Sequence, residues 1–175
     1  MTPEESRAFA RAWRWILTGL ACFWATVATL VFPPAPRLVW NASDSAPRGL
    51  YRVSPGTLPV RGDMVIAWAP EPYRSLAAER HYLPSNVPLV KRVAAVAGDR
   101  VCAQGHAILV NGRRVASRLE VDGKGRSMPW WRGCRTLSAG EYLLLMDAAA
   151  SFDGRYFGIS REAELVGKTW PLWTR

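Results

Sequence analysis

The chain has 175 residues, of which 49% are hydrophobic, and its formal net charge is +9. This length suits one globular domain with a short appendage, and the hydrophobic content excludes a wholly disordered protein. The basic residues are spread along the chain without a lysine or arginine run, so a nucleic-acid-binding protein is not favoured, whereas attraction to anionic lipid is compatible with the charge.

The first predicted element is a membrane-spanning helix over Trp15–Phe32, a stretch without a charged residue. A helix of this length spans about 27 Å, which is close to the hydrocarbon thickness of a bilayer. Prolines follow at once, beginning with Pro33, and a helix is expected to end there. A cleaved signal peptide is the alternative, but its apolar region is shorter and a site of the A-x-A kind would follow. We therefore expect an uncleaved anchor.

The flanks of this helix predict its orientation. Arg7, Arg11 and Arg14 precede it, and basic flanks stay on the cytoplasmic side. The expected organisation is a cytoplasmic segment over residues 1–14, the membrane helix over 15–32, a linker over 33–40 and a domain over 41–175 on the far side of the membrane. This predicts a single-pass membrane protein.

The outer domain reads as short strands between turns, which predicts a mainly β domain. Asn111-Gly112 predicts a tight hairpin, because both positions tolerate a positive φ. The segments Ala69–Pro88, with four prolines, and 120–138, with little periodicity, are expected to be loops. The predicted strands are Gly49–Val53, Asp63–Trp68, Leu89–Ala97, Arg100–Cys102, Ile108–Val110, Arg113–Val115, Leu143–Met146 and Leu165–Thr169.

The segment directly after the anchor contains two serines, Ser43 and Ser45, ahead of Pro47 and Gly49. A turn rich in small polar residues is one interpretation of this pattern. The other is a nucleophile, since a serine hydroxyl attacks a carbonyl once a neighbouring base takes its proton.

A candidate base lies in the predicted strand Leu89–Ala97. Lys91 is one of only three lysines among 23 basic residues, and strand alternation puts it on the apolar face opposite Arg92. Burial makes the charged form of a lysine costly, and a lysine with a pKa of roughly 7–8 can act as a general base. The alternative is an edge-strand lysine that reaches water through its flexible stem.

The three cysteines suit this topology. Cys22 is expected to pack within the membrane helix, whereas Cys102 and Cys134 lie in an oxidising compartment, where they can form a disulfide. Two free thiols, or a metal site that also uses His106, remain as alternatives, although a metal needs more ligands at closer spacing.

Histidine is an unpromising base in this chain. His81 lies in the predicted loop and His106 in a turn before a hairpin, so neither context favours a Ser–His–Asp triad with Ser45.

Four motifs in order resemble those of the type I signal peptidase superfamily. Ser45 with Pro47 and Gly49-Leu50-Tyr51 matches the first motif, and Arg61–Val65, Lys91–Val93 with Gly98-Asp99, and Ser151–Gly158 match the others. The form Ser-Ala-Pro-Arg-Gly-Leu-Tyr departs from the general leader peptidases, which have Met after the serine. It is similar to the TraF branch, the pilin-maturing peptidases of plasmid conjugation, and the short chain also suits that branch.

The resemblance implies an antiparallel β-sheet catalytic domain of the signal-peptidase kind with a Ser–Lys dyad. Ser45 then matches the nucleophile and Lys91 the general base, while the Ser43 hydroxyl and the Ser45 backbone N–H hold the oxyanion. Ser151 matches the residue that hydrogen-bonds the lysine amine, and Asp153 with Arg155 matches a bracing pair. Neither a cofactor nor a metal is implied.

Three functions follow as hypotheses. The first is a serine endopeptidase that matures a prepilin, either by hydrolysis or by a peptide-bond transfer that closes the pilin into a ring. The second is a general signal peptidase that acts on secretory precursors. The third is a scaffold of an envelope secretion system without catalysis. The expected partners are a membrane-emergent precursor polypeptide and the lipid bilayer.

Overall fold

The computed structural model describes residues 3–32 and 35–175, with side chains from residue 11 on. The chain divides into two compact units, Met1–Ala35 and Pro36–Arg175. Pro33 and Pro34, the expected helix stop and the first residues of the expected linker, lie outside the described residues.

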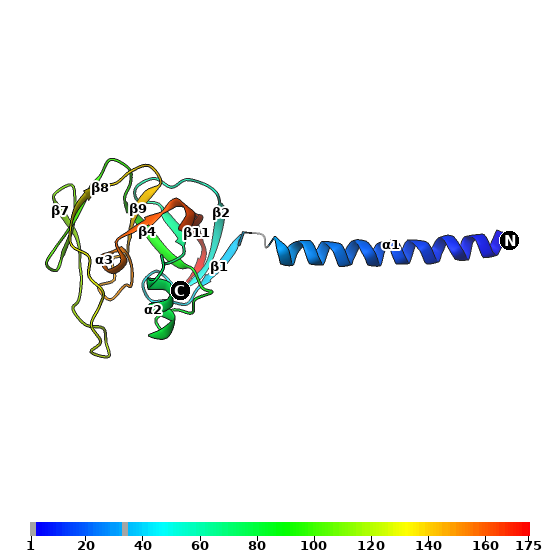
Figure 1. Ribbon diagram of the computed structural model, residues 1–175, viewed down its shortest axis with the longest axis horizontal. Helices are drawn as coiled ribbons and strands as arrows, with labels where there is room; N and C mark the ends of the chain where they lie inside the picture. Colours follow the sequence, from blue (N-terminus) through cyan, green and yellow to red (C-terminus); the bar gives the residue numbers. More distant parts are fainter. Residues whose placement is uncertain (1–2, 33–34) are drawn as a thin grey trace. The chain divides into compact units, whose positions relative to one another are not determined.

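The first unit is a single helix, α1, over Pro3–Val31 (Figure 1). It extends well before the predicted span, and its apolar part, long enough to cross a membrane, covers Arg11–Val31 with a mean hydropathy of 1.5. Thr18 and Thr26 direct their hydroxyls to backbone carbonyls four residues earlier, so these polar groups are satisfied within the helix.

The second unit is built from two antiparallel β-sheets, which confirms the mainly β prediction (Figure 1). The larger sheet has seven strands in the order β1 (Leu38–Asn41), β2 (Gly49–Pro55), β11 (Leu165–Thr174), β3 (Met64–Ala67), β4 (Leu89–Ala95), β9 (Glu141–Leu145) and β10 (Ile159–Arg161). The smaller sheet has four strands in the order β7 (Arg113–Ser117), β6 (Ala107–Val110), β5 (Arg100–Gln104) and β8 (Gly133–Thr136). Three short helical elements complete the unit: α2 (Tyr73–Glu79), α3 (Gly154–Phe157) and a 3₁₀ turn (Glu162–Glu164).

Apolar side chains of both sheets form a shared core. Residues of β4, β5, β6 and β9 contribute to one buried cluster, in which Val101, Ile108 and Leu143 are fully enclosed. Figure 1 shows the smaller sheet, with β7 and β8, at the end of the unit away from β1 and β2. The smaller sheet is therefore anchored to the larger one by hydrophobic packing.

The hairpin between β6 and β7 confirms the turn predicted from Asn111-Gly112. Both residues have a positive φ, 50° and 80°, and Val110 pairs with Arg113 across the turn. The short loop with this geometry fixes the register of the two strands.

The structure corrects the loop predicted over Ala69–Pro88, which contains α2. Two of its four prolines, Pro70 and Pro72, lie at the start of the helix, and Pro72 is the N-cap, where the missing N–H costs nothing. Ala77 is buried, and Tyr73 packs against a cluster that includes Phe157.

The loop predicted over 120–138 is also wrong in part. It contains β8 and an irregular hairpin closed by a bridge between Val121 and Ser127. Every residue of β8 is exposed, so this edge strand carries no alternation of buried and exposed positions that a sequence pattern could reveal. For similar reasons β1, which begins within the predicted linker, and the three-residue β10 were not predicted.

A disulfide joins Cys102 of β5 to Cys134 of β8. The two residues are directly opposite each other in the strand pairing, and they are separated by 32 positions in sequence. Their sulfurs are therefore bonded to each other and not free to bind a metal with His106.

Candidate active site

Ser45 lies in the turn between β1 and β2, and two buried side chains shape this turn. The Asn41 amide nitrogen donates to the carbonyls of Ser43, Ala46 and Pro47 at 3.0–3.1 Å, and its oxygen accepts from the Ser43 N–H at 3.2 Å. The Tyr51 hydroxyl donates to the Pro47 carbonyl at 2.8 Å. The turn is thus held from both of its strands, and Ser45 stays half-buried at its tip.

The turn brings the two serines together. Their hydroxyl oxygens lie 2.7 Å apart, and the Ser45 backbone N–H donates to the Ser43 oxygen at 3.2 Å. The Ser43 hydroxyl and the Ser45 N–H, which are the groups expected to hold an oxyanion, therefore both lie beside the Ser45 hydroxyl. In the free protein they satisfy each other, so a developing oxyanion would have to replace this contact.

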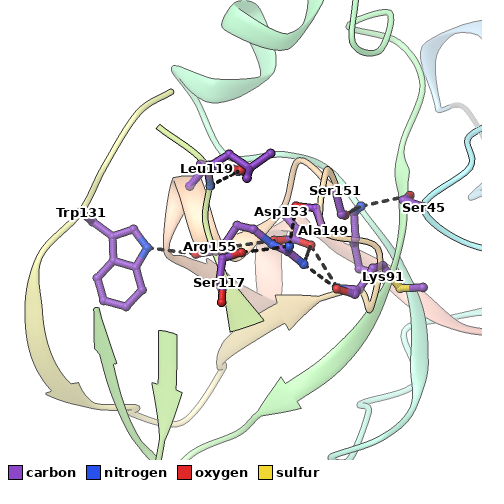
Figure 2. A network of polar contacts seen from close by, with 12 residues as sticks. Ser45, Lys91, Ser117, Leu119, Trp131, Ala149, Ser151, Asp153 and Arg155 are labelled. Atoms are coloured by element: carbon purple, nitrogen blue, oxygen red, sulfur yellow. Dashed lines mark hydrogen bonds and ion pairs between the residues drawn. The ribbon is translucent and has the colours of Figure 1, made fainter. Parts of the chain in front are cut away.

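Lys91 lies on β4, an interior strand between β3 and β9. This position excludes the edge-strand alternative, because the side chain is only 2% exposed while its neighbour Arg92 points outward. The Lys91 amine lies 3.3 Å from the Ser45 hydroxyl oxygen and 2.7 Å from that of Ser151 (Figure 2). Its position next to a hydroxyl and away from water is what a general base requires.

Burial lowers the pKa of Lys91 from its ordinary 10.5 to about 8. Loss of solvation is the main cause, since it disfavours the charged ammonium. Two nearby charges act in opposite directions: the Asp153 carboxylate raises the pKa of this amine and the Arg155 guanidinium lowers it. A substantial fraction of the amine is therefore uncharged just above neutral pH.

The connection between β9 and β10 supplies the other polar groups of the site. Ser151 is buried, and Asp153 and Arg155 are 0% and 2% exposed. The Asp153 carboxylate accepts from the Arg155 Nε at 2.8 Å and from the Met146 N–H at 3.0 Å, and it caps α3 by accepting from the Arg155 N–H at 3.1 Å. The buried carboxylate is thus fully hydrogen-bonded, as its burial requires.

Arg155 ties this connection to its surroundings. Its guanidinium donates to the carbonyls of Met146, Ala149 and Ser117, so it links the end of β9, the loop after it and the end of β7 (Figure 2). The next residue back, Gly154, leaves no room for a side chain, because a Cβ there would lie 2.8 Å from the Leu144 carbonyl oxygen. The Asp153–Arg155 ion pair therefore acts as a rigid support for the loop that carries Ser151.

A cavity of about 420 Å³ opens above Ser45 and Lys91. Ser43, Ser45, Lys91 and Ser151 line it on one side. Two further walls come from the segment after α2 and from the hairpin over residues 119–128, and they include Tyr82, Leu83, Leu119, Val121, Asp122 and Met128. An extended chain with apolar side chains fits a cavity of this lining.

The two histidines stay away from this cavity. His81 is exposed on the segment after α2, and His106 is exposed, with Glu120 3.4 Å away and its ring against that of Trp130. Neither residue lines the cavity. A Ser–His–Asp triad around Ser45 is therefore not formed.

The motif at Arg61 has a structural role. Arg61 forms an ion pair with Asp99, whose carboxylate also accepts from Asn111 at 2.8 Å and from the Val96 N–H at 2.9 Å. These contacts tie the start of β3 to the turn after β4. They stabilise the strand that carries Lys91 without entering the cavity.

Several residues of the site were not found from the sequence. Asn41 carries no periodic or spacing signal, and its role depends on the path of the turn that it holds. Tyr156 is buried and lines the cavity, and its hydroxyl accepts from the Leu119 N–H at 3.1 Å. The cavity-lining residues Tyr82 and Asp122 lie in segments that were expected to be loops.

Comparison with known proteins places this geometry in context. Residues 10–173 match the family model described as signal peptidase, peptidase S26. The chain is 31% identical over 146 residues to a plasmid transfer protein TraF of Escherichia coli, a match that covers 77% of this chain and 81% of the relative. It is 32% identical over 144 residues to a conjugal transfer protein TraF of Agrobacterium fabrum, with the same coverage. A crystal structure of a signal peptidase I from Enterococcus faecalis overlaps 64% of this chain and 97% of its own, at 19% identity and a TM-score of 0.38.

Proposed function

The chain belongs to the signal peptidase family, peptidase S26, and from this premise we propose that it is a membrane-anchored serine endopeptidase with a Ser45–Lys91 dyad. The observation that carries the proposal is a buried lysine amine 3.3 Å from a serine hydroxyl at the edge of a cavity. Ser45 is the serine at this cavity whose hydroxyl lies beside the Lys91 amine together with the expected oxyanion donors.

The reaction begins with proton transfer. The uncharged Lys91 amine takes the Ser45 hydroxyl proton while the Ser45 oxygen attacks the carbonyl carbon of the substrate peptide bond. The tetrahedral intermediate collapses when the resulting ammonium returns the proton to the leaving amine, which departs as the new N-terminus. The acyl group stays on Ser45 as an ester until a second nucleophile attacks it.

The oxyanion of the intermediate needs donors that are already in place. The Ser45 N–H and the Ser43 hydroxyl adjoin each other, and each is released from their mutual contact when the carbonyl oxygen accepts from both. One such donor is worth roughly 3–4 kcal/mol of transition-state stabilisation. Ser43→Ala is therefore expected to lower kcat by a factor of about 10²–10³ with KM little changed.

Ser151 and the Asp153–Arg155 pair support the base. Ser151 keeps the Lys91 amine within reach of Ser45, because its hydroxyl lies 2.7 Å from Nζ. The ion pair fixes the loop that carries Ser151. No step of this reaction needs a cofactor, and all the proton transfers use groups of this chain.

The substrate is proposed from the relatives, whose names connect them with plasmid and conjugal transfer. We take it to be a conjugative prepilin that emerges from the bilayer. The acyl-enzyme at Ser45 has two chemical outcomes: water gives a linear product, and the amine of the same pilin gives a ring by peptide-bond transfer.

The proposed location is the bacterial inner membrane, with the N-terminus in the cytoplasm and the catalytic domain in the periplasm. The arginines at the start of the apolar helix support this orientation. The domain also presents exposed apolar side chains on β1 and β11, and tryptophan favours the membrane interface. These residues are Leu38, Trp40, Trp170, Leu172 and Trp173. We propose that lipid is the partner of this surface.

The proposal is tested with the full chain in detergent micelles, incubated with candidate prepilins and with an unrelated secretory precursor. Intact mass separates the outcomes, because a ring is lighter than the linear product by one water. Cleavage of a prepilin alone supports the proposal, and cleavage of the secretory precursor supports the general signal peptidase instead. Retained pilin maturation by Ser45→Ala would refute the dyad and favour a scaffold.

The pH dependence gives a second test. The base must be uncharged, so kcat/KM is expected to rise tenfold per pH unit below the pKa of Lys91 and to level off above about 8. A profile that is flat between pH 6 and pH 9 would contradict an acid–base role for this amine.

A further inference from the structure

The two walls that face the Ser45–Lys91 pair come from segments far apart in sequence. One is the segment 80–83 after α2, and the other is the hairpin over 119–128, which lies outside both sheets. Both contribute side chains to the cavity, among them Tyr82 and Val121. Since neither wall is part of a sheet, their separation depends on the contacts between them.

Polar side chains connect these walls directly. The Tyr82 hydroxyl donates to the Asp122 carboxylate at 2.5 Å, and the Arg80 guanidinium donates to the Ser127 carbonyl at 2.8 Å. In the other direction, Arg126 donates to the Arg80 carbonyl at 3.2 Å, and its guanidinium lies 5.3 Å from the centre of the Tyr82 ring. We call Arg80, Tyr82, Asp122 and Arg126 the clasp.

Asp122 is the centre of the clasp. Its carboxylate accepts from the N–H groups of Lys124 and Arg126 and from the Arg126 Nε, in addition to the Tyr82 hydroxyl. The side chain is only 7% exposed. The Tyr82 hydroxyl is the largest cause that lowers the pKa of Asp122, and the backbone N–H groups add to it. The carboxylate is therefore charged at neutral pH, and its hydrogen bonds are charge-assisted.

The clasp also contacts the loop that carries Ser151 through aromatic packing. The ring of Tyr82 lies 5.3 Å from that of Phe152, which directly follows Ser151 and stacks on Tyr156 at 5.9 Å. Tyr156 in turn accepts from the Leu119 N–H at the start of the hairpin. The two walls and the loop that carries Ser151 thus form one packed unit at the rim of the cavity.

We propose that the clasp sets the width of the cavity and thereby makes Tyr82 and Asp122 specificity-determining residues, which limit the size of the side chain that enters next to the cleaved bond. This inference rests on the proposed function, because it concerns the substrate of the same site. When the clasp opens, the walls separate and larger apolar side chains enter.

The test compares full-length wild type with Asp122→Asn, Tyr82→Phe and the double variant. The substrates are fluorescent peptides that cover the cleavage region of a candidate prepilin, with Ala, Val or Leu before the cleaved bond. In Asp122→Asn one amide oxygen remains for the turn N–H groups, and Tyr82→Phe removes only the hydroxyl between the walls. Each single variant is expected to lower the ratio of kcat/KM for the Ala peptide to that for the Leu peptide by about tenfold. An apolar pocket distinguishes substrates that differ by a methylene group by about this factor in kcat/KM.

The double variant should lower the ratio no further than one single variant, because both remove the same contact. Glu120→Gln is the matched control: it removes a carboxylate from the same hairpin, but its side chain is 70% exposed and faces His106. Its ratio should match that of wild type. A ratio unchanged in all clasp variants would overturn the proposal.

Two further measurements separate the clasp from the proposed function. Peptide binding, followed by fluorescence anisotropy, reports the Ala-to-Leu preference even if wild type cleaves nothing, an outcome that would refute the endopeptidase alone. Amide hydrogen exchange reports the hairpin itself, where Tyr82→Phe should accelerate exchange over residues 119–128 at least fivefold. Unchanged exchange, or binding of none of the peptides, would overturn the clasp as a determinant of specificity.

Discussion

The two sheets of the outer domain each adjoin a buried guanidinium group, and they surround it with different partners. Beside the larger sheet, Arg155 pairs with the buried carboxylate of Asp153 close to Lys91. Beside the smaller sheet, Arg118 is equally buried, but its hydrogen bonds go to the carbonyls of Gly105 and Trp131. Its guanidinium also lies 4.0 Å from the centre of the Trp130 ring.

The difference teaches what a buried charge does in each region. Near Ser45, the charges of Asp153 and Arg155 both act on the Lys91 amine, so their balance bears on the chemistry as well as the fold. In the smaller sheet, a cation held by carbonyl dipoles and an indole face only has to stabilise packing. Changes in the first region should therefore alter rates and their pH dependence, and changes in the second should alter stability alone.

The largest effect is expected at Lys91. Lys91→Arg keeps a charge that cannot be lost, so prepilin cleavage should fall by at least about 10³–10⁴-fold, which is the scale for loss of a catalytic residue. Single-turnover cleavage by the full chain measures it. A variant that retains one tenth of the wild-type rate would contradict a base at this position.

Lys91→Met separates catalysis from folding at the same site. It should be as inactive, yet more stable than wild type at neutral pH by about 1–3 kcal/mol, because the folded protein no longer buries an amine whose pKa is lowered. In the unfolded chain the Lys91 amine is protonated below its ordinary pKa of 10.5. In the folded protein it is protonated only below about 8. The stability difference should therefore shrink as the pH rises from 8 towards 10.5, which urea titrations at several pH values test.

The next largest effect is expected at the buried ion pair. Asp153→Asn leaves the Arg155 charge without its carboxylate and should reduce the free energy of unfolding by about 3–5 kcal/mol. It also removes the charge that raises the pKa of Lys91, so the midpoint of the pH–rate profile should fall below about 8. The double variant Asp153→Asn/Arg155→Met should recover part of the stability. A midpoint that moves upward would contradict this electrostatic account.

In the smaller sheet, the disulfide gives the corresponding stability test. Replacement of Cys102 and Cys134 by alanine opens a loop of 32 positions and should lower the free energy of unfolding by about 3–4 kcal/mol. The pH midpoint of cleavage should not move. Cys22→Ala, which changes an exposed thiol on α1, is the control and should alter neither quantity. A shifted midpoint in the disulfide variant would show that the two regions are coupled.

The smallest effect is expected at Arg118. Arg118→Met leaves the carbonyls of Gly105 and Trp131 without their donor and should reduce the free energy of unfolding by about 1–3 kcal/mol. The pH–rate profile should remain that of wild type, in contrast to the Asp153 variant. Arg113→Met, an exposed change on the neighbouring β7, serves as control. A shift of the pH midpoint in the Arg118 variant would remove the distinction between the two buried arginines.

The fold class was accessible from local patterns in the sequence. The strand with Lys91 has a buried face and an exposed Arg92, as alternation predicts, and the Asn111-Gly112 turn adopts the positive φ values that these residue types favour. Elements without such a pattern were not predicted from the sequence. β8 is exposed throughout, and α2 begins next to prolines, which are typical of loops. Local periodicity detects an element only when one of its faces is buried.

The sequence by itself determined the apolar helix, the mainly β class and the candidates Ser45 and Lys91, because their signals lie in short stretches of chain. Only the tertiary structure decided that Lys91 lies on an interior strand, 3.3 Å from a hydroxyl that is 46 positions away. It also decided which segments form the walls of the cavity and hold them together through Tyr82 and Asp122. The physical reason is that desolvation and hydrogen bonding depend on what surrounds a group in space, and residues distant in sequence provide those surroundings.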